Sequence, residues 1–270
     1  MTTKPLIPGF DPVKPQSDAN LIKASYAMPL DSKPGEKHAY SNLGYYILAE
    51  IIYRVAQKPW LQYLNERIFA RLGMNATRST NLEEVIPRRV DGYEFVDGKY
   101  KNGAIVIGVM PSGAFLSNIQ DLAKWDAALY SNELFSQQER EMMWTPVKLN
   151  DGSEKPYGFG WSLGKVGKHR QVRHAGTMAG FRTEIVRFVD DRLTIIVLAN
   201  VGQALPEKIA LGVASRYISD LLPKRKAVKV SHDVLNEYCR TISNLRRACI
   251  EYFPKRRQVN ARNVCWRNKI

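Results

Sequence analysis

Residues 171–202, QVRHAGTMAGFRTEIVRFVDDRLTIIVLANVG, decide the fold of this 270-residue chain. The stretch holds three runs rich in β-branched and aromatic residues, and short turns with glycine or aspartate separate them. This pattern predicts three consecutive strands joined by tight turns. The third run, LTIIVLAN (193–200), is apolar at successive positions, which predicts an interior strand covered on both faces.

Helical patterns surround the predicted strands. Apolar residues recur at helical spacing in NLGYYILAEIIYRVAQ (42–57), which predicts an amphipathic helix with one buried face. The other stretches that predict helices are 19–28, 59–73, 119–131, 136–145 and 206–222. YEFVDGKYKNG (93–103) predicts a hairpin that turns at Asp97-Gly98, and 157–163 predicts a further strand. Helices placed before an antiparallel sheet, with one helix after it, predict an α+β layered domain.

Positive charge gathers near the C-terminal end. In residues 221–270, 13 Lys and Arg residues stand against three acidic residues, so most of the net charge of +14 lies there. The change of composition near Leu222-Pro223 predicts two parts, residues 1–222 and a basic extension, residues 223–270. The extension also holds all three cysteines, Cys239, Cys249 and Cys265. Their spacing fits no metal motif, and their odd number argues against a closed set of disulfides.

Six motifs follow one another along the chain: Tyr40-Ser41-Asn42, the helix after it, Leu72-Gly73-Met74, the helix start at Ser117-Asn118, Tyr157-Gly158-Phe159-Gly160-Trp161 and His174-Ala175-Gly176. In this order and spacing, residues 1–222 resemble the serine β-lactamase and penicillin-binding-protein superfamily. The branch most similar is that of class C β-lactamases, D-Ala-D-Ala carboxypeptidases and related esterases. The resemblance implies a β-lactamase-like antiparallel sheet flanked by helices, beside a helical region. It also implies hydrolysis of amide or ester bonds through an acyl-enzyme, with no cofactor.

The family combines a Ser-x-x-Lys nucleophile motif with Tyr-x-Asn and with Lys-or-His-x-Gly on a strand. By resemblance, Tyr40 corresponds to the general base and Asn42 to the amide that orients the acyl substituent. His174 corresponds to the cation or donor that holds the substrate carboxylate, and a histidine there makes the charge depend on pH. The substrate-binding residues implied next to it are Ala175, Gly176 and Thr177, where the backbone N–H of Thr177 forms half of an oxyanion hole.

The nucleophile motif has no counterpart upstream of Tyr40, where the family places it. We therefore expect a truncated chain that lacks the nucleophile helix and two N-terminal strands, and that shows little or no turnover. Ser162-Leu163-Gly164-Lys165 matches Ser-x-x-Lys as a string, and Gly160 to Gly164 matches a nucleophile elbow. An elbow needs a strand before it and a helix after it, whereas another strand is predicted here. Ser162 is thus favoured as an ordinary strand serine over a nucleophile.

Each candidate residue also has a purely structural interpretation. Tyr40 could be a buried tyrosine before a helix, and Ser41 or Asn42 could cap that helix. His174 could be an edge histidine satisfied by its neighbours. The ordered motifs favour the site for Tyr40 and His174, whereas both interpretations of Asn42 stay open. The histidines without a partner pattern, which receive no assignment, are His38, His169 and His232.

Two other classes of function remain open. A non-catalytic pseudoenzyme could keep Tyr40, Asn42 and His174 and bind small acyl or carboxylate ligands. The basic extension could bind nucleic acid, but we do not expect this, because residues 240–270 look like an out-of-frame tail. Without the N-terminal strands, LTIIVLAN would become an exposed edge, which predicts self-association.

Cofactors and membranes are not expected. The spacing of His, Cys and Asp matches no metal site, and no glycine-rich loop has phosphate-binding spacing. The chain has no apolar run long enough for a membrane span, and MTTKPLIPGFDP lacks the pattern of a signal peptide. We expect the chain as written to stay in the cytoplasm, although full-length relatives could be exported.

Overall fold

The computed structural model describes residues 18–26, 28–79, 84–103, 110–113 and 115–223, together with Asp233 and Glu237. The chain separates into two compact units, residues 1–223 and residues 224–270. The three cysteines and His232 of the predicted basic extension lie outside the described residues. Within the described segments, no helix combines the length and the apolarity that crossing a membrane requires.

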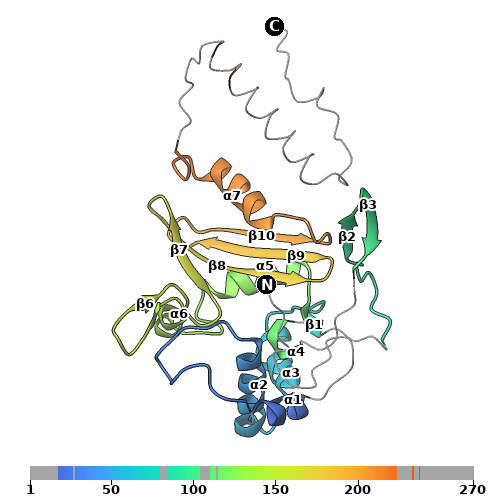
Figure 1. Cartoon of the computed structure of the whole chain (residues 1–270), viewed down its shortest axis with the longest axis vertical. Helices are drawn as coiled ribbons and strands as arrows, with labels where there is room; N and C mark the ends of the chain where they lie inside the picture. The colour runs from blue at the N-terminus through green and yellow to red at the C-terminus, as the bar shows by residue number, and fades with distance from the viewer. Residues whose placement is uncertain are drawn as a thin grey trace. The chain divides into compact units, whose positions relative to one another are not determined.

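An antiparallel four-stranded sheet forms the centre of the first unit, in the order β7-β8-β9-β10 (Figure 1). The strands are β7 (Ser162–Val166), β8 (His169–Met178), β9 (Phe181–Phe188) and β10 (Leu193–Ala199). The three strands predicted in residues 171–202 are therefore confirmed. The turn between β8 and β9 contains Gly180, whose φ of +75° is a left-handed conformation that glycine adopts at little cost.

The prediction that residues 193–200 form an interior strand is wrong for the described sheet, because β10 lies at its end and pairs only with β9. Its apolar character has another cause. Helix α7 (Pro206–Tyr217) packs against one face of the sheet, and α5 (Ile119–Ala128) contacts β10 from the other (Figure 1). Both faces of the strand are thus covered, although within the described residues no further strand of the sheet pairs with its other edge.

Alternation along β9 divides the core into two layers. Val186 and Phe188 point toward α7 and pack with Ala210 and Ala214 of that helix. Ile185, on the opposite face, packs in a second cluster with Leu129 and other residues near α5. His174 pairs directly with Ile185, and opposite residues in a sheet share a face. The imidazole of His174 therefore lies on the side of the sheet away from α7.

A buried arginine joins the sheet to α5. Nε of Arg187 donates to Oδ1 of Asp126 at 2.6 Å, and Oγ1 of Thr194 donates to the same oxygen at 2.8 Å. The Arg187 side chain has no exposed surface, and its guanidinium lies over the rings of Tyr130 and Trp144, at 4.4 and 5.0 Å from their centroids. This cation is held by one carboxylate and two aromatic faces.

The helices before the sheet largely follow the predicted pattern, except that one predicted helix is divided and the short helix α4 was not predicted. Helix α2 (Asn42–Ala56) is capped by the side chain of Ser41, and α6 (Gln137–Met143) begins with a capping box. The predicted helix 59–73 is divided into α3 (Trp60–Leu64) and the π-helical turn η1 (Asn65–Phe69). The remaining short helices are α1 (Asp18–Ser25) and α4 (Met110–Gly113).

The described part of the unit also contains three two-stranded sheets. The hairpin predicted at residues 93–103 is confirmed as β2 (Tyr93–Val96) and β3 (Lys99–Asn102), with positive φ at both turn residues, Asp97 and Gly98. The other pairs are β1 (Arg78–Ser79) with β4 (Phe115–Leu116), and β5 (Val147–Lys148) with β6 (Glu154–Lys155). The described chain is thus the mixed arrangement of helices and antiparallel sheet that the sequence predicts.

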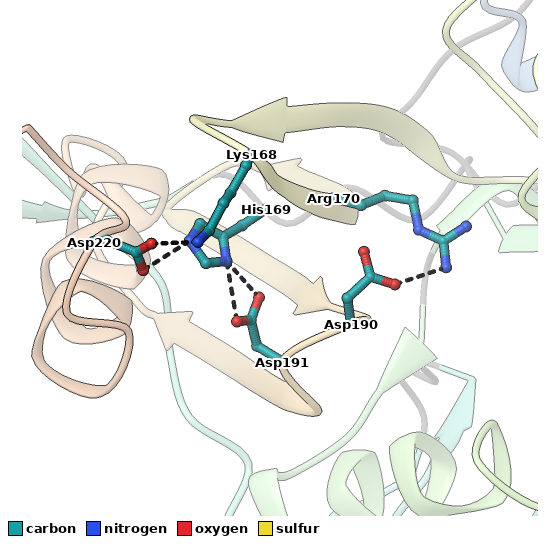
Figure 2. Close-up of polar contacts among 6 residues, drawn as sticks. All are labelled: Lys168, His169, Arg170, Asp190, Asp191 and Asp220. Carbon is teal, nitrogen blue, oxygen red and sulfur yellow. Dashed lines mark hydrogen bonds and ion pairs between the residues drawn. The ribbon is translucent and has the colours of Figure 1, made fainter.

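His169, to which the sequence gives no partner, lies between two carboxylates (Figure 2). Its Nδ1 contacts both oxygens of Asp191, at 3.0 and 2.9 Å, and its Nε2 contacts Oδ1 of Asp220 at 3.0 Å. Ionised carboxylates only accept hydrogen bonds, so both contacts are satisfied together only by the doubly protonated ring. A hydrogen bond from Lys168 chiefly, and the charge of His169 to a smaller extent, lower the pKa of Asp220. The cluster joins the start of β8, the turn after β9 and the end of α7.

Replacing His169 with alanine should lower the free energy of unfolding by about 1–2 kcal/mol, because two carboxylates lose their shared donor. Urea denaturation at neutral pH measures the change. The matched control is Arg170→Ala, whose ion pair with Asp190 is half exposed on both sides and should contribute at most about 0.5 kcal/mol. Equal effects of the two substitutions would show that the buried cluster contributes no more than a surface pair.

Candidate functional site

Tyr40 and His174, far apart in sequence, are neighbours in the structure. Tyr40 immediately precedes the cap of α2, and His174 lies in the middle of β8. Their ring centroids are 6.2 Å apart, with the ring planes inclined by 37°. Tyr40 is 56% exposed, so the alternative that it is a buried tyrosine is wrong. A ligand at this place would meet an accessible phenol beside an imidazole.

Tyr157 is a third aromatic residue of the site, which the sequence analysis missed. Its hydroxyl lies 2.8 Å from Nε2 of His174, and its ring is 6.5 Å from that of Tyr40. The sequence predicted a strand over 157–163, but β7 begins only at Ser162. Gly160 has a φ of +76°, and N–H of Gly158 donates to the carbonyl of Trp161 at 2.7 Å. The two glycines thus form a tight turn in place of a strand.

Tyr45 and His38 surround Tyr157 from the other side. The phenols of Tyr45 and Tyr157 lie close enough for each to influence the pKa of the other, and the ring of His38 lies 5.2 Å from that of Tyr157. Tyr45 belongs to the first turn of α2, four residues after Ser41. Helical spacing therefore places it at the same end of the helix as Tyr40, and this signal could have identified it.

The hydrogen bonds of His174 define its tautomer. Nδ1 lies 2.8 Å from the carbonyl oxygen of Ala175, which can only accept, so Nδ1 carries a proton. In the neutral ring, Nε2 is then an acceptor for the hydroxyl of Tyr157. Both ring nitrogens of His174 thus have hydrogen-bond partners within the protein, as the structural interpretation of an edge histidine satisfied by its neighbours predicts.

Tyr157 is a donor at neutral pH. Its burial, and the neighbouring phenols of Tyr45 and Tyr40, raise the pKa of Tyr157 far above its usual range. Burial also raises the pKa of Tyr45, more than the hydrogen bond with Tyr157 lowers it. Because both groups stay protonated, neither can act as a base, and they serve the site through hydrogen bonding.

Asn42 is the first residue of α2 and is half-buried. Ser41 caps the helix, because its Oγ accepts from N–H of Gly44 at 3.2 Å. Of the two interpretations of Asn42, the helix cap is therefore wrong. Its contact with a substrate stays a prediction.

The residues after His174 form an accessible stretch of β8. Ala175 and Thr177 are exposed and pair with Glu184 and Arg182. Gly176 pairs with Thr183, and a Cβ on this glycine would come within 2.2 Å of the Thr183 hydroxyl. A side chain at position 176 would force that threonine to move, which explains the glycine.

Ser162 lies in neither of the settings that its two motifs require. It is the first residue of β7, pairs with Arg173 and is followed by strand residues through Val166. A nucleophile elbow needs a helix after the serine, and Ser-x-x-Lys needs a helix around both residues. The structure thus places Ser162 as the strand serine that the sequence favoured.

Among the described residues, no group of three His, Cys, Asp or Glu side chains could hold a metal ion. Two surface hollows lie away from Tyr40 and His174. One is beside α6, and the other is at the end of α7, next to Asp191 and Asp220. The described site is therefore a set of aromatic and imidazole groups on an accessible face.

Comparison of sequences supports the motif analysis. The family model described as Beta-lactamase matches residues 3–215. The chain is 32% identical over 202 residues to penicillin-binding protein 4* of Bacillus subtilis (strain 168), covering 69% of this chain and 45% of that protein. It is 26% identical over 225 residues to a D-aminopeptidase of Brucella anthropi, covering 78% of this chain and 41% of that protein. The chain thus spans less than half the length of these curated relatives.

Solved structures with the same fold include an octameric penicillin-binding protein homologue from Pyrococcus abyssi. It has a TM-score of 0.68 and 24% identity, and the match covers 75% of this chain and 48% of that one. The D-amino acid amidase of Ochrobactrum anthropi SV3 complexed with D-phenylalanine has a TM-score of 0.60 and 22% identity, covering 77% of this chain and 65% of that one. At these identities the likeness concerns the fold alone.

Proposed function

Since the chain belongs to the Beta-lactamase family, a family of serine hydrolases, we propose that it binds small acyl or carboxylate compounds beside Tyr40 and His174 without forming an acyl-enzyme. The observation that carries this proposal is the meeting of these two rings, 6.2 Å apart, from a loop and a strand. The half-exposed phenol of Tyr40 and the exposed residues Ala175 and Thr177 are the groups that we expect a ligand to contact.

The residues of the chain support the proposed absence of acylation. Within the 270 residues, Ser-x-x-Lys occurs once, at Ser162 to Lys165, and these residues are in a strand. A phenol is a weak base unless a nearby cation favours the phenolate. No lysine corresponding to the family's nucleophile motif accompanies Tyr40. Without an attacking hydroxyl, the remaining groups can bind and orient a ligand, but they cannot form the covalent intermediate.

D-amino acids are the ligand class that we propose first. One curated relative is a D-aminopeptidase, and one structural relative is a D-amino acid amidase seen with D-phenylalanine. A free D-amino acid supplies a carboxylate for the polar groups of the site, and an aromatic side chain that can pack on the exposed ring of Tyr40. D-phenylalanine is therefore the probe, and L-phenylalanine is its stereochemical control.

Thermal unfolding of the 270-residue chain tests this binding. D-phenylalanine at 100 times its Kd should raise the Tm by about 5 °C or more, because a ligand of the native state stabilises it by mass action. Tyr40→Phe and His174→Asn should reduce the shift, and Arg170→Ala, which removes an exposed ion pair with Asp190 near the start of β8, should not. No shift at saturating D-phenylalanine, or a shift insensitive to both site substitutions, would contradict the proposal.

Self-association is a second part of the proposal, supported by β10. This strand has no charged side chain between Leu193 and Ala199, and it lies at the end of the described sheet. Such an edge is a template for pairing with another chain, and the Pyrococcus abyssi homologue is octameric. Sedimentation should show assemblies of the chain, and Ile196→Lys should dissociate them. Nucleic-acid binding by residues 223–270 concerns residues almost all outside the described part of the chain, and it is not favoured.

A further inference from the structure

Tyr157, His174 and the carbonyl group of Ala175 form a continuous series of hydrogen bonds at the candidate site. The hydroxyl of Tyr157 lies 2.8 Å from Nε2 of His174, and Nδ1 of His174 lies 2.8 Å from the carbonyl oxygen of Ala175. The carbonyl at the end of the series gives it a direction. Because that oxygen can only accept, each donor before it is determined in turn.

In the neutral state the protons can be arranged in one way that satisfies every contact. Nδ1–H of His174 donates to the carbonyl oxygen of Ala175, and the hydroxyl of Tyr157 donates to Nε2. These hydrogen bonds favour one tautomer of the imidazole, which could otherwise exchange between its two neutral tautomers.

We propose that Tyr157 is a positioning residue that fixes the Nδ1–H tautomer and the ring orientation of His174. Only the consequence of this role rests on the proposed function: Tyr157 would determine whether the imidazole offers a donor or an acceptor to a ligand beside Tyr40. Tyr157 does not itself need to touch that ligand.

The backbone around Tyr157 suits it to this role. N–H of Tyr157 donates to the carbonyl of Lys155 at 2.7 Å, and the carbonyl of Tyr157 accepts from N–H of Val147 at 3.0 Å. Gly160 follows with a positive φ, and a Cβ at that position would lie 3.0 Å from the hydroxyl oxygen of Tyr45. The turn is therefore held to β5 and β6, and its glycine leaves room for Tyr45. These constraints aim the phenol of Tyr157 at His174 with little freedom.

Protonation of His174 reverses one bond in the series. When Nε2 also carries a proton, it must donate to the oxygen of Tyr157, and the proton of that phenol must turn away. The groups facing His174 and Tyr157 from the surrounding elements are the phenols of Tyr40 and Tyr45 and the ring of His38. Protonation of the imidazole would thus reverse the direction of its hydrogen bond with Tyr157, on the face where a ligand would bind.

Nitrogen NMR of the full chain labelled with ¹⁵N-histidine tests the proposal, because the two tautomers have distinct ring-nitrogen shifts. The chain has four histidines, and His174→Asn identifies the signals of His174. In the unsubstituted protein at a pH where this ring is neutral, the Nδ1–H tautomer should predominate. Tyr157→Phe should move the tautomer ratio about five- to tenfold toward Nε2–H, the loss expected for one hydrogen bond.

Tyr40→Phe is the matched control, since it keeps the ring beside His174 and should leave the tautomer ratio unchanged. The His169 signals report whether each variant keeps its fold. An Nε2–H tautomer in the unsubstituted protein, or an unchanged ratio in folded Tyr157→Phe, would overturn the proposal. The experiment contains no ligand. Failure of D-phenylalanine to bind would therefore contradict the proposed function and leave the tautomer result standing.

Discussion

Replacing Arg187 with methionine should lower the free energy of unfolding by about 3–5 kcal/mol, the largest effect expected of any single side chain considered for this protein. Arg187 has no exposed surface, and its partner Asp126 is only 16% exposed. Removing the guanidinium leaves a largely buried carboxylate with a single neutral donor, Thr194. It also removes the cation that lies between the rings of Tyr130 and Trp144.

Urea denaturation at neutral pH measures this effect, and two further variants separate its causes. Arg170→Met removes a cation of the same type from an exposed pair and should cost at most about 0.5 kcal/mol. The double substitution Arg187→Met with Asp126→Leu should recover much of the loss, because it leaves no unpaired charge. A loss below about 1 kcal/mol for Arg187→Met would show that the ion pair and its aromatic contacts do not hold α5 to the sheet.

Replacing Gly158 with alanine should lower the free energy of unfolding by about 3 kcal/mol or more, the range of large effects that steric overlap produces. A Cβ on Gly158 would lie 2.0 Å from the carbonyl oxygen of Met143, a backbone atom that cannot rotate away. The turn that holds Tyr157 would have to separate from the end of α6. The same substitution should therefore displace Tyr157 from His174.

Gly212→Ala is the control for Gly158→Ala. Gly212 lies within α7, and an added Cβ there meets no atom within 4 Å. Alanine should stabilise this helix by about 0.5–1 kcal/mol, because glycine loses more backbone entropy on folding. Opposite signs for the two glycines are expected in the same denaturation assay. A small loss at position 158 would mean that the contact with Met143 relaxes easily.

Local patterns predicted most of the secondary structure, because the forces that form these elements act between near neighbours. The three strands within 171–202 and the hairpin at Asp97-Gly98 each followed from alternation and turn residues. The cap of α5 followed from Asn118, whose side chain accepts from N–H of Asp121. The π-helical turn at 65–69 has no comparable signature, since it differs from an α-helix only in the register of a few hydrogen bonds.

Contacts between residues far apart in the sequence could not be predicted from local patterns. His169 acquires its role from Asp191 and Asp220, which lie 22 and 51 residues away, and no spacing rule connects them. The prediction that β10 is an interior strand was wrong because apolar side chains indicate that the faces of a strand are covered. They do not indicate whether its edge is paired. Position in a sheet depends on pairing across the whole chain, which a single stretch does not contain.

The candidate site was predicted through family resemblance and not through spacing. Resemblance directed attention to Tyr40 and His174, which the fold brings together, and it gave no role in the site to Tyr157, Tyr45 or His38. Tyr157 was missed because a run of glycines and aromatic residues predicts a strand as well as a turn. The roles assigned to Asn42, Ala175, Gly176 and Thr177 stay predictions, to be tested with bound ligand.

The central proposal is that this chain binds ligands beside a phenol and an imidazole, Tyr40 and His174, without a serine that attacks them. Intact-mass spectrometry of the purified 270-residue chain, after incubation with a fluorescent penicillin and with an activated ester, tests it most directly. The account predicts an unchanged mass with both reagents. A stoichiometric covalent adduct that Ser162→Ala abolishes, or one on any other serine, would contradict it.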